Sequence, residues 1–157
     1  MGLPQGWLEM EGYGKEVSRV VLDGGGSSYG FVSKTEDRGQ TWRDLKLHTA
    51  KIQGISFISK TTGYISSLAG EILKTTDGGA TWSLITRGVP SGELHFSDEA
   101  HGVLASSSAV YLTHDSGVTW RSVYQAPVSI RQMRFISKTT GFIVGDKALI
   151  GKIELHY

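Results

Sequence analysis

The sequence has no cysteine, few prolines and almost no net charge. Without cysteine, a disulfide framework, a thiolate metal site and a cysteine nucleophile are all excluded. Sixteen Lys and Arg against fifteen Asp and Glu leave a net charge of +1. No overall field therefore draws the chain to nucleic acid or to an anionic membrane. We predict no nucleic-acid partner, no membrane partner and no cofactor.

Long apolar stretches are missing as well. Nowhere do 18 apolar residues run together, as a membrane-spanning helix requires. The opening residues MGLPQGWLEMEGYGKE lack the basic and then apolar segments of a signal peptide. These features predict a cytoplasmic protein, or a periplasmic or secreted one if a signal was removed. A chain of 157 residues suits one domain, 1–157.

Glycine and β-forming residues are what the sequence does contain. Twenty-one glycines accompany only three prolines, and the apolar residues are mainly Val, Ile, Leu, Tyr, Phe and Trp. This mixture is typical of short strands joined by tight turns. No helical periodicity extends over 11 or more residues. The composition predicts an all-β protein with essentially no α-helix.

Two motifs recur along the chain. Asp, one residue, Gly, one residue, Thr and Trp follow one another at Asp37, Asp77 and Asp115, which are 40 and 38 residues apart. The heptapeptide FISKTTG occurs at 57–63 and again at 135–141, with a diverged copy, FSDEAHG, halfway between them. A period of this length indicates a repeat architecture.

A large apolar residue follows each tryptophan of the series by 14 or 15 residues. The pairs are Trp7 and Val21, Trp42 and Phe57, Trp82 and Phe96, and Trp120 and Phe135. Trp7 thereby joins the series although no Asp motif precedes it, and the chain contains four units. We predict repeats at about 12–47, 48–86, 87–125 and 126–157, the last one completed by 7–11.

Each unit is expected to form four short strands. In the second unit they are predicted at 54–58, 64–67, 71–75 and 81–85; in the first, the second strand is expected to be degraded around 24–28. Four short strands cannot cover both faces of their own sheet, but radial stacking of such sheets in a β-propeller covers them. We predict a propeller of four-stranded antiparallel blades, four per chain.

The order of the motifs predicts how the ring closes. The last unit has three strands and ends where its Asp motif would begin, while GWLEME at the start supplies one strand. We expect this N-terminal strand to complete the C-terminal blade. Either a four-bladed monomer or an eight-bladed ring of two chains would satisfy the pattern. The homodimer is favoured because such short blades leave little material to fill the wide wedges of a four-bladed ring.

The repeated turn has a structural explanation. An Asp carboxylate accepts hydrogen bonds from backbone N–H groups one to three residues ahead, Gly permits positive φ, and Trp packs between sheets. A catalytic group is needed once, whereas a turn is needed in every blade. We predict a structural role, with no catalytic residue and no metal ligand among them, for Asp37, Gly39, Trp42, Asp77, Gly79, Trp82, Asp115, Gly117 and Trp120.

The frame S-x-D-x-G-x-T-W resembles the Asp-box, or BNR, repeat of the WD40/YVTN/BNR-like superfamily. The longer pattern, from FISKTTG to ILKTTDGGATW, resembles repeats of the photosystem II assembly and stability factor family. Over nearly the whole chain, this resemblance implies a propeller. It does not select a function, because Asp boxes also occur in sialidases, other glycoside hydrolases and sortilin-type receptors.

Catalytic patterns are not evident. The seven arginines show no family motif that would make a sialidase triad, and the five histidines lack metal-ligand spacing. We therefore predict that the chain is not an enzyme but a scaffold that binds a protein or peptide. Carbohydrate binding or sialidase-like glycoside hydrolysis is the alternative.

Ligands of propellers usually meet the face formed by two sets of loops, those between blades and those between second and third strands. The loops between blades are expected at 13–16, 47–53, 87–92 and 125–130; the others are expected at 67–70, 106–108 and 145–147. We predict ligand contacts from five side chains on this face: His48, Lys51, Arg87, Tyr124 and Lys147.

Overall fold

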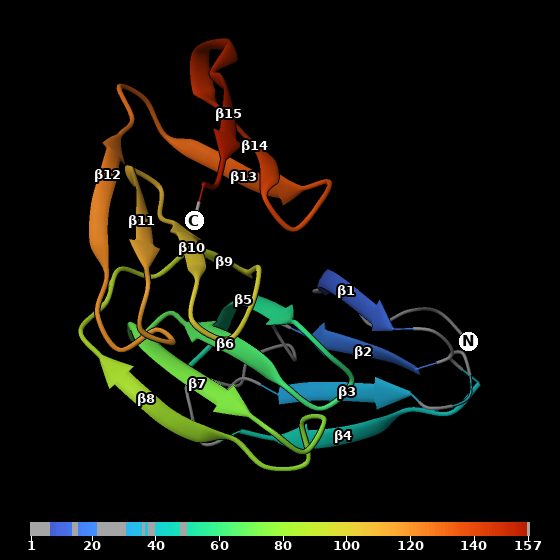
Figure 1. The fold of residues 1–157 in the computed structure, drawn as a ribbon. Helices are drawn as coiled ribbons and strands as arrows, with labels where there is room; N and C mark the ends of the chain where they lie inside the picture. Colours follow the sequence, from blue (N-terminus) through green and yellow to red (C-terminus); the bar gives the residue numbers. More distant parts are fainter. Residues whose placement is uncertain are drawn as a thin grey trace.

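The computed structural model describes residues 7–13, 16–21, 31–35, 37, 40–47 and 50–156. In this part of the chain, regular structure consists of strands and one short 3-10 turn, Asp146–Ala148. The strands form four separate antiparallel sheets. Figure 1 shows these sheets following one another along an arc, with the first and last sheets at its two ends. The four sheets therefore do not close a ring by themselves.

Each sheet is a simple meander in which neighbours in sequence are neighbours in space. We number the sheets blade 1 to blade 4. Blade 1 contains β1 (Trp7–Tyr13), β2 (Glu16–Val21), β3 (Phe31–Thr35) and β4 (Arg43–Lys46). Blade 2 contains β5 (Ile52–Phe57), β6 (Gly63–Ser67), β7 (Glu71–Thr75) and β8 (Ser83–Arg87). Blade 3 contains β9 (Glu93–Phe96), β10 (Gly102–Ala105), β11 (Ala109–Thr113) and β12 (Arg121–Gln125), and blade 4 contains β13 (Ile130–Phe135), β14 (Thr140–Gly145) and β15 (Ile150–Glu154).

The all-β prediction and the four-stranded blade are confirmed. In blade 2, every strand begins and ends within two residues of its predicted bounds. The agreement has a local cause, because strands of four to six residues are separated here by turns rich in Gly, Ser and Thr.

The predicted place of the N-terminal strand is wrong. Strand β1 pairs antiparallel with β2, from Trp7 beside Val21 to Tyr13 beside Glu16, while blade 4 keeps three strands. Residues 7–11 therefore belong to blade 1 and not to the last repeat. A hairpin with so short a connection closes at little entropic cost and competes well with a distant partner. The 14-residue spacing from Trp7 to Val21 reflects this hairpin register and not the repeat.

Strand β2 takes the place of the second strand that was expected around 24–28. That expected segment lies outside the described residues. Tyr13 and Glu16, where β1 ends and β2 begins, are paired, and they lie at the same end of the blade as Thr35, where β3 ends. This assignment corrects the prediction that 13–16 belongs to the opposite loop face.

Apolar clusters fill the space between consecutive blades. One joins Val32 of blade 1 to Ile55 and Phe57 of blade 2, and the next joins Tyr64 and Ile72 of blade 2 to residues of blade 3. A third joins blade 3 to blade 4 and contains Val103, Ala105, Val110, Ile130, Met133 and Ile143. Blades 2 and 3, which have a neighbouring blade on each side, thus bury both faces of their sheets, as the stacking of four-stranded units requires.

The repeated Phe and Gly of FISKTTG are cross-strand partners. Phe57 pairs with Gly63, and the same register joins Phe96 to Gly102 and Phe135 to Gly141. A Cβ atom on Gly63 would lie 2.7 Å from the Phe57 ring. Since the ring occupies the space of a side chain, only glycine fits beside it.

Candidate functional site

The turn at Asp77 is held by its carboxylate. The backbone N–H of Thr81 and the hydroxyl of Thr75 both donate to Oδ1, at 2.9 and 2.8 Å, and the Thr81 hydroxyl donates to Oδ2 at 2.6 Å. Asp37 and Asp115 accept the same set of bonds from their own threonines. These backbone donors lie four residues ahead of the aspartate, one position beyond the predicted range. Backbone hydrogen bonds from residues three ahead, within that range, also lower the pKa of each aspartate.

Glycine and tryptophan complete the turn. Gly79 has φ of 89° and Gly117 has φ of 86°, the left-handed region that favours glycine. Trp82 donates from Nε1 to the Gly79 carbonyl at 3.1 Å, and its ring meets Phe57 edge-on at 6.0 Å. Trp120 makes the equivalent bond and ring contact in blade 3, whereas Trp42 is exposed, and Gly39 lies outside the described residues. This geometry stabilises a turn; membership of the Asp-box repeats stays a prediction.

The turn carboxylates should make stability depend on pH. Hydrogen bonds, first of all from the Thr41 and Thr81 side chains, lower the pKa of Asp37 and of Asp77 from 3.8 to about 2. Because the pKa in the folded state lies below that in the unfolded state, the stabilisation is present above pH 3.8 and is lost as the pH falls toward 2. We expect Asp77→Asn to melt at a lower temperature than the wild type at neutral pH and to lose less stability on acidification. Circular dichroism melts from pH 7 to pH 2 test this, and parallel curves for the two proteins would contradict it.

The two sets of loops predicted to form one face do lie together. The N–H of Leu68, in the β6–β7 turn, donates to the Lys51 carbonyl at 2.7 Å, and that of Val89 donates to the Gly70 carbonyl at 3.2 Å. In the same way, the N–H of Ala126 donates to the Ser108 carbonyl, and that of Asp146 donates to the Ser129 carbonyl. In blades 2 to 4, each loop between blades is therefore fastened to a hairpin of a neighbouring blade.

The four predicted contact side chains that the structure describes are not gathered at one site. Arg87 ends β8 and pairs with Glu71 at 3.3 Å, in a cavity of about 400 Å³ between the outer strands of blades 1 and 2. Tyr124 lies exposed on the outer strand of blade 3, Lys147 lies in the 3-10 turn of blade 4, and Lys51 is half-buried. His48 is outside the described residues. A ligand-binding role for these residues stays a prediction.

A different cavity on this loop face brings three blades together. It measures about 270 Å³ and lies where β5, β9 and β13 begin, beside the β10–β11 turn. Polar groups dominate its wall: Gln53, Ser91, Glu93, Ser106, Ser107, Arg131 and Gln132. We call this cavity the loop-face pocket. The structure thus gathers residues that were not among the five predicted contacts. Gln53, Ser91, Ser106 and Ser107 lie within the predicted loops, and Glu93, Arg131 and Gln132 come directly after them.

The charged groups of the loop-face pocket are held in place. Glu93 is partly buried and accepts the N–H of Met133. Burial raises the pKa of the Glu93 carboxyl, opposed by the Met133 hydrogen bond and by Arg134. Arg131 donates from Nε and Nη2 to both carboxylate oxygens of Asp146, at 2.7 and 2.8 Å. The two charged side chains of the wall are therefore held by partners within the chain.

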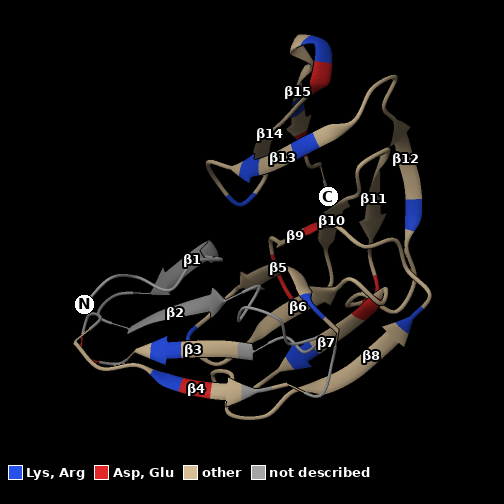
Figure 2. Cartoon of the chain, turned by 180° about the vertical axis from the view of Figure 1, so that it is seen from behind, with Lys and Arg blue, Asp and Glu red and all other residues tan. Residues whose placement is uncertain are grey.

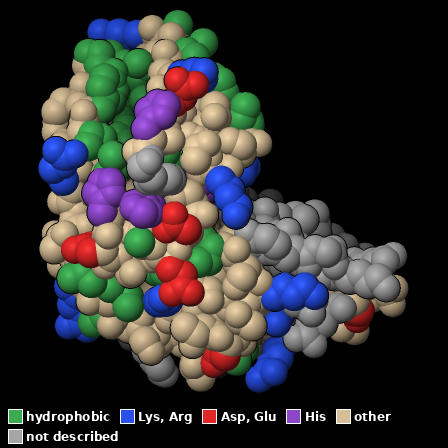
Figure 3. Space-filling view, viewed as in Figure 1, with side chains coloured by type: hydrophobic (Ala, Val, Ile, Leu, Met, Phe, Trp, Pro, Cys, Tyr) green, Lys and Arg blue, Asp and Glu red, His purple; other side chains and the backbone are tan. Residues whose placement is uncertain are grey.

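Histidines gather on another face, between blades 3 and 4. Figure 3 shows them close together beside acidic side chains. His101, His114 and His156 line a cavity of about 200 Å³, and the first two rings meet edge-on at 5.3 Å. Among the residues that the structure describes, however, no group of three or more His, Asp or Glu side chains could hold a metal ion. No helix in the described part of the chain is long and apolar enough to cross a membrane.

Comparison with solved structures identifies the fold. Neither a family model nor a curated protein matches the sequence. The chain is similar to YCF48 bound to D1 peptide, with 23% identity and a TM-score of 0.73 over 98% of this chain and 51% of that one. YCF48 from Cyanidioschyzon merolae matches 98% of this chain and 72% of its own, with 14% identity and a TM-score of 0.52. A gluconolactonase from Xanthomonas campestris matches 89% of this chain and 54% of its own, with 14% identity and a TM-score of 0.65.

These likenesses and the four meander sheets define the class of protein. The chain has the β-propeller fold, and three of the four antiparallel blades in its described part have four strands. It spans about half the length of the peptide-bound YCF48 chain and of the gluconolactonase. At sequence identities of 14% to 23%, these likenesses show the fold alone.

Proposed function

We propose that this chain is a non-catalytic propeller scaffold that binds a protein or peptide at its loop face. The loop-face pocket carries the proposal, because three blades contribute polar side chains to one concave site. The likeness to a propeller bound to D1 peptide supports a peptide rather than a small molecule as ligand. An extended segment of polar residues would satisfy the Glu93 carboxylate and the neighbouring amides and hydroxyls.

Carbohydrate binding or glycoside hydrolysis is the second candidate function. The fold that the chain shares with a gluconolactonase supports this candidate, and an assay of enzymatic activity tests it. Glycosidases of the common kind need two carboxyl groups on opposite sides of the bond that breaks. Among the described residues that line the loop-face pocket, Glu93 is the one carboxylate. This composition favours binding over hydrolysis.

A bulky side chain in the pocket should block the ligand. Ser107 is exposed at the pocket wall, so Ser107→Trp fills the cavity without disturbing the core. Peptides selected from a displayed random library, labelled and measured by fluorescence anisotropy, should bind this variant about tenfold more weakly or worse. Ser83→Trp, at an exposed serine of the outer strand β8, is the matched control and should bind normally.

Two results would overturn this function. Selection could enrich no peptide above a control surface while a glycan array retains the protein, which would favour the carbohydrate reading. Equal binding by the Ser107→Trp and Ser83→Trp proteins would place the ligand elsewhere.

The homodimer predicted from the sequence belongs to the same proposal. Blades 2 to 4 line the loop-face pocket, and a second chain would complete the ring on the side opposite to these blades. The cytoplasmic location, or a periplasmic or secreted one after removal of a signal, likewise stays a prediction.

A further inference from the structure

The last blade exposes apolar side chains on the face directed away from blade 3. Ile136 and Ile150 are each 74% exposed, and Val144 is 41% exposed. In the register of blade 4, Val144 lies beside Ile150, and Phe142 lies beside Lys152. We call these five residues the outward face of blade 4.

The same positions are covered in blade 2. The two copies of FISKTTG align Ile136 with Ile58 and Phe142 with Tyr64, and the strand register aligns Ile150 with Ile72. Tyr64 and Ile72 are 0% exposed, and Ile58 packs against their cluster. The outward face of blade 4 therefore carries large apolar residues at positions that are buried in the other blade.

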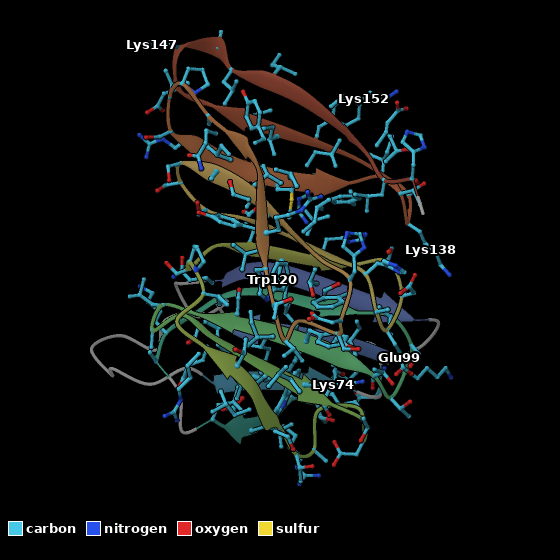
Figure 4. All side chains as sticks on the ribbon, turned by 60° about the vertical axis from the view of Figure 1, so that its left-hand side comes forward. Lys74, Glu99, Trp120, Lys138, Lys147 and Lys152 are labelled. Atoms are coloured by element: carbon cyan, nitrogen blue, oxygen red, sulfur yellow. The ribbon has the colours of Figure 1, made fainter. Side chains whose placement is uncertain are left out.

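Blade 3 is what covers these positions in blade 2. The Tyr64 ring stacks on Phe96 at 3.7 Å, and its hydroxyl donates to the Glu99 carbonyl at 3.0 Å. Lys74 reaches the Glu99 carboxylate at 3.3 Å, and Figure 4 shows these two residues close together. Lys74 has a side chain 19% exposed, whereas Lys152, at the equivalent position of blade 4, is 54% exposed.

Blade 4 covers blade 3 in the same manner. Val103 and Val110 of blade 3 are 0% and 3% exposed beneath Met133 and Ile143, and His95 stacks on Phe135 at 3.8 Å. In blades 2 and 3, the face directed away from the preceding blade thus packs against the following blade. The outward face of blade 4 is the next face in this series.

We infer that the outward face of blade 4 receives blade 1 of a second copy of this chain, so that two chains close one eight-bladed ring. The arc has two open ends, and a two-fold ring of copies covers both with one contact made twice. Residues 130–154 have five Lys or Arg and two acidic residues, with basic positions along β13 in Figure 2. The four strands of blade 1 contain four basic and four acidic residues, so net charge does not oppose the contact.

This inference rests on the homodimer of the proposed function and not on its peptide. The loop-face pocket is bounded by the inner strands of blades 2 to 4.

The mass in solution tests the ring. By light scattering after gel filtration, the wild type should have twice the 17.0 kDa of one chain, and Ile150→Asp should have the mass of one chain with an unchanged circular dichroism spectrum. Val123→Asp, at an exposed valine of the outer strand β12, is the control and should stay dimeric. A wild-type monomer, a mass that grows beyond two chains with concentration, or a dimeric Ile150→Asp protein would overturn the inference. A dimer that binds no peptide would contradict the proposed peptide binding but not the ring. A monomer that binds peptide would contradict the ring but not the peptide binding.

Cross-linking tests which surfaces meet, whatever the folding of the aspartate variant. The chain has no cysteine, so Ile150→Cys and Glu9→Cys each introduce a single thiol, one in blade 4 and one in β1. A short bismaleimide should join the two variants when they are mixed and should not join Ile150→Cys to itself. Linkage of Ile150→Cys to itself would mean that two copies of blade 4 face each other. No linkage in the mixture would mean that blade 4 of one chain does not meet blade 1 of the other. Either result overturns the ring.

Discussion

Tyr64→Ala is expected to lower the free energy of unfolding by about 3–5 kcal/mol, the range for removing a large buried aromatic side chain. Tyr64 is 0% exposed and belongs to the cluster between blades 2 and 3. Its ring stacks on Phe96, and its hydroxyl donates to the Glu99 carbonyl. Alanine would leave a cavity between two blades and an unsatisfied carbonyl at its edge. Urea unfolding followed by tryptophan fluorescence measures the change.

Two further variants separate the parts of this effect. Tyr64→Phe removes the hydroxyl alone and should cost about 0.5–1.5 kcal/mol, the net contribution of one hydrogen bond. Tyr124→Ala removes the same side chain from an exposed site on the outer strand of blade 3, and it should change stability by about 0.5 kcal/mol or less. Equal losses for Tyr64→Ala and Tyr124→Ala would show that packing between blades does not decide the stability of the fold.

Gly92→Ala is expected to destabilise the protein by about 3 kcal/mol, the upper part of the range for overpacking. A Cβ atom on Gly92 would lie 2.1 Å from the Ala105 carbonyl oxygen and 2.6 Å from its carbon. These are backbone atoms of the neighbouring strand, so no side-chain rotation relieves the contact, and β9 must move away from β10. Since Gly92 lines the loop-face pocket, peptide affinity should fall as well.

Gly88→Ala is the matched control for Gly92→Ala. Gly88 has φ of 78°, and a Cβ atom there would meet nothing within 4 Å. The strain of the left-handed conformation alone should cost about 1–2 kcal/mol. Thermal melts of both variants compare the two causes, and a greater loss for Gly88→Ala would mean that β9 and β10 separate easily.

The repeated elements of the fold could be predicted from sequence because their determinants are local. The period of the Asp motif located the turns, whose carboxylates bind a threonine four residues ahead. The Phe and Gly of FISKTTG marked strand partners only a few residues apart, such as Phe57 and Gly63. The composition and the period together predicted four-stranded blades, and the solved structures confirm the propeller fold.

The partner of the N-terminal strand, the location of the pocket and the bare face of the last blade needed the tertiary structure. The spacing of Trp7 and Val21 fitted both a repeat and a hairpin, and only the actual pairing distinguished the two. Gln53, Glu93 and Arg131 lie about 40 residues apart along the chain and meet because three inner strands begin at one place on the arc. Ile72 and Ile150 occupy the same position of the repeat, yet one is 0% and the other 74% exposed. Local hydrogen bonding makes each blade, whereas burial depends on which blade lies beside it, and that neighbour is set by the arrangement of the whole chain in space.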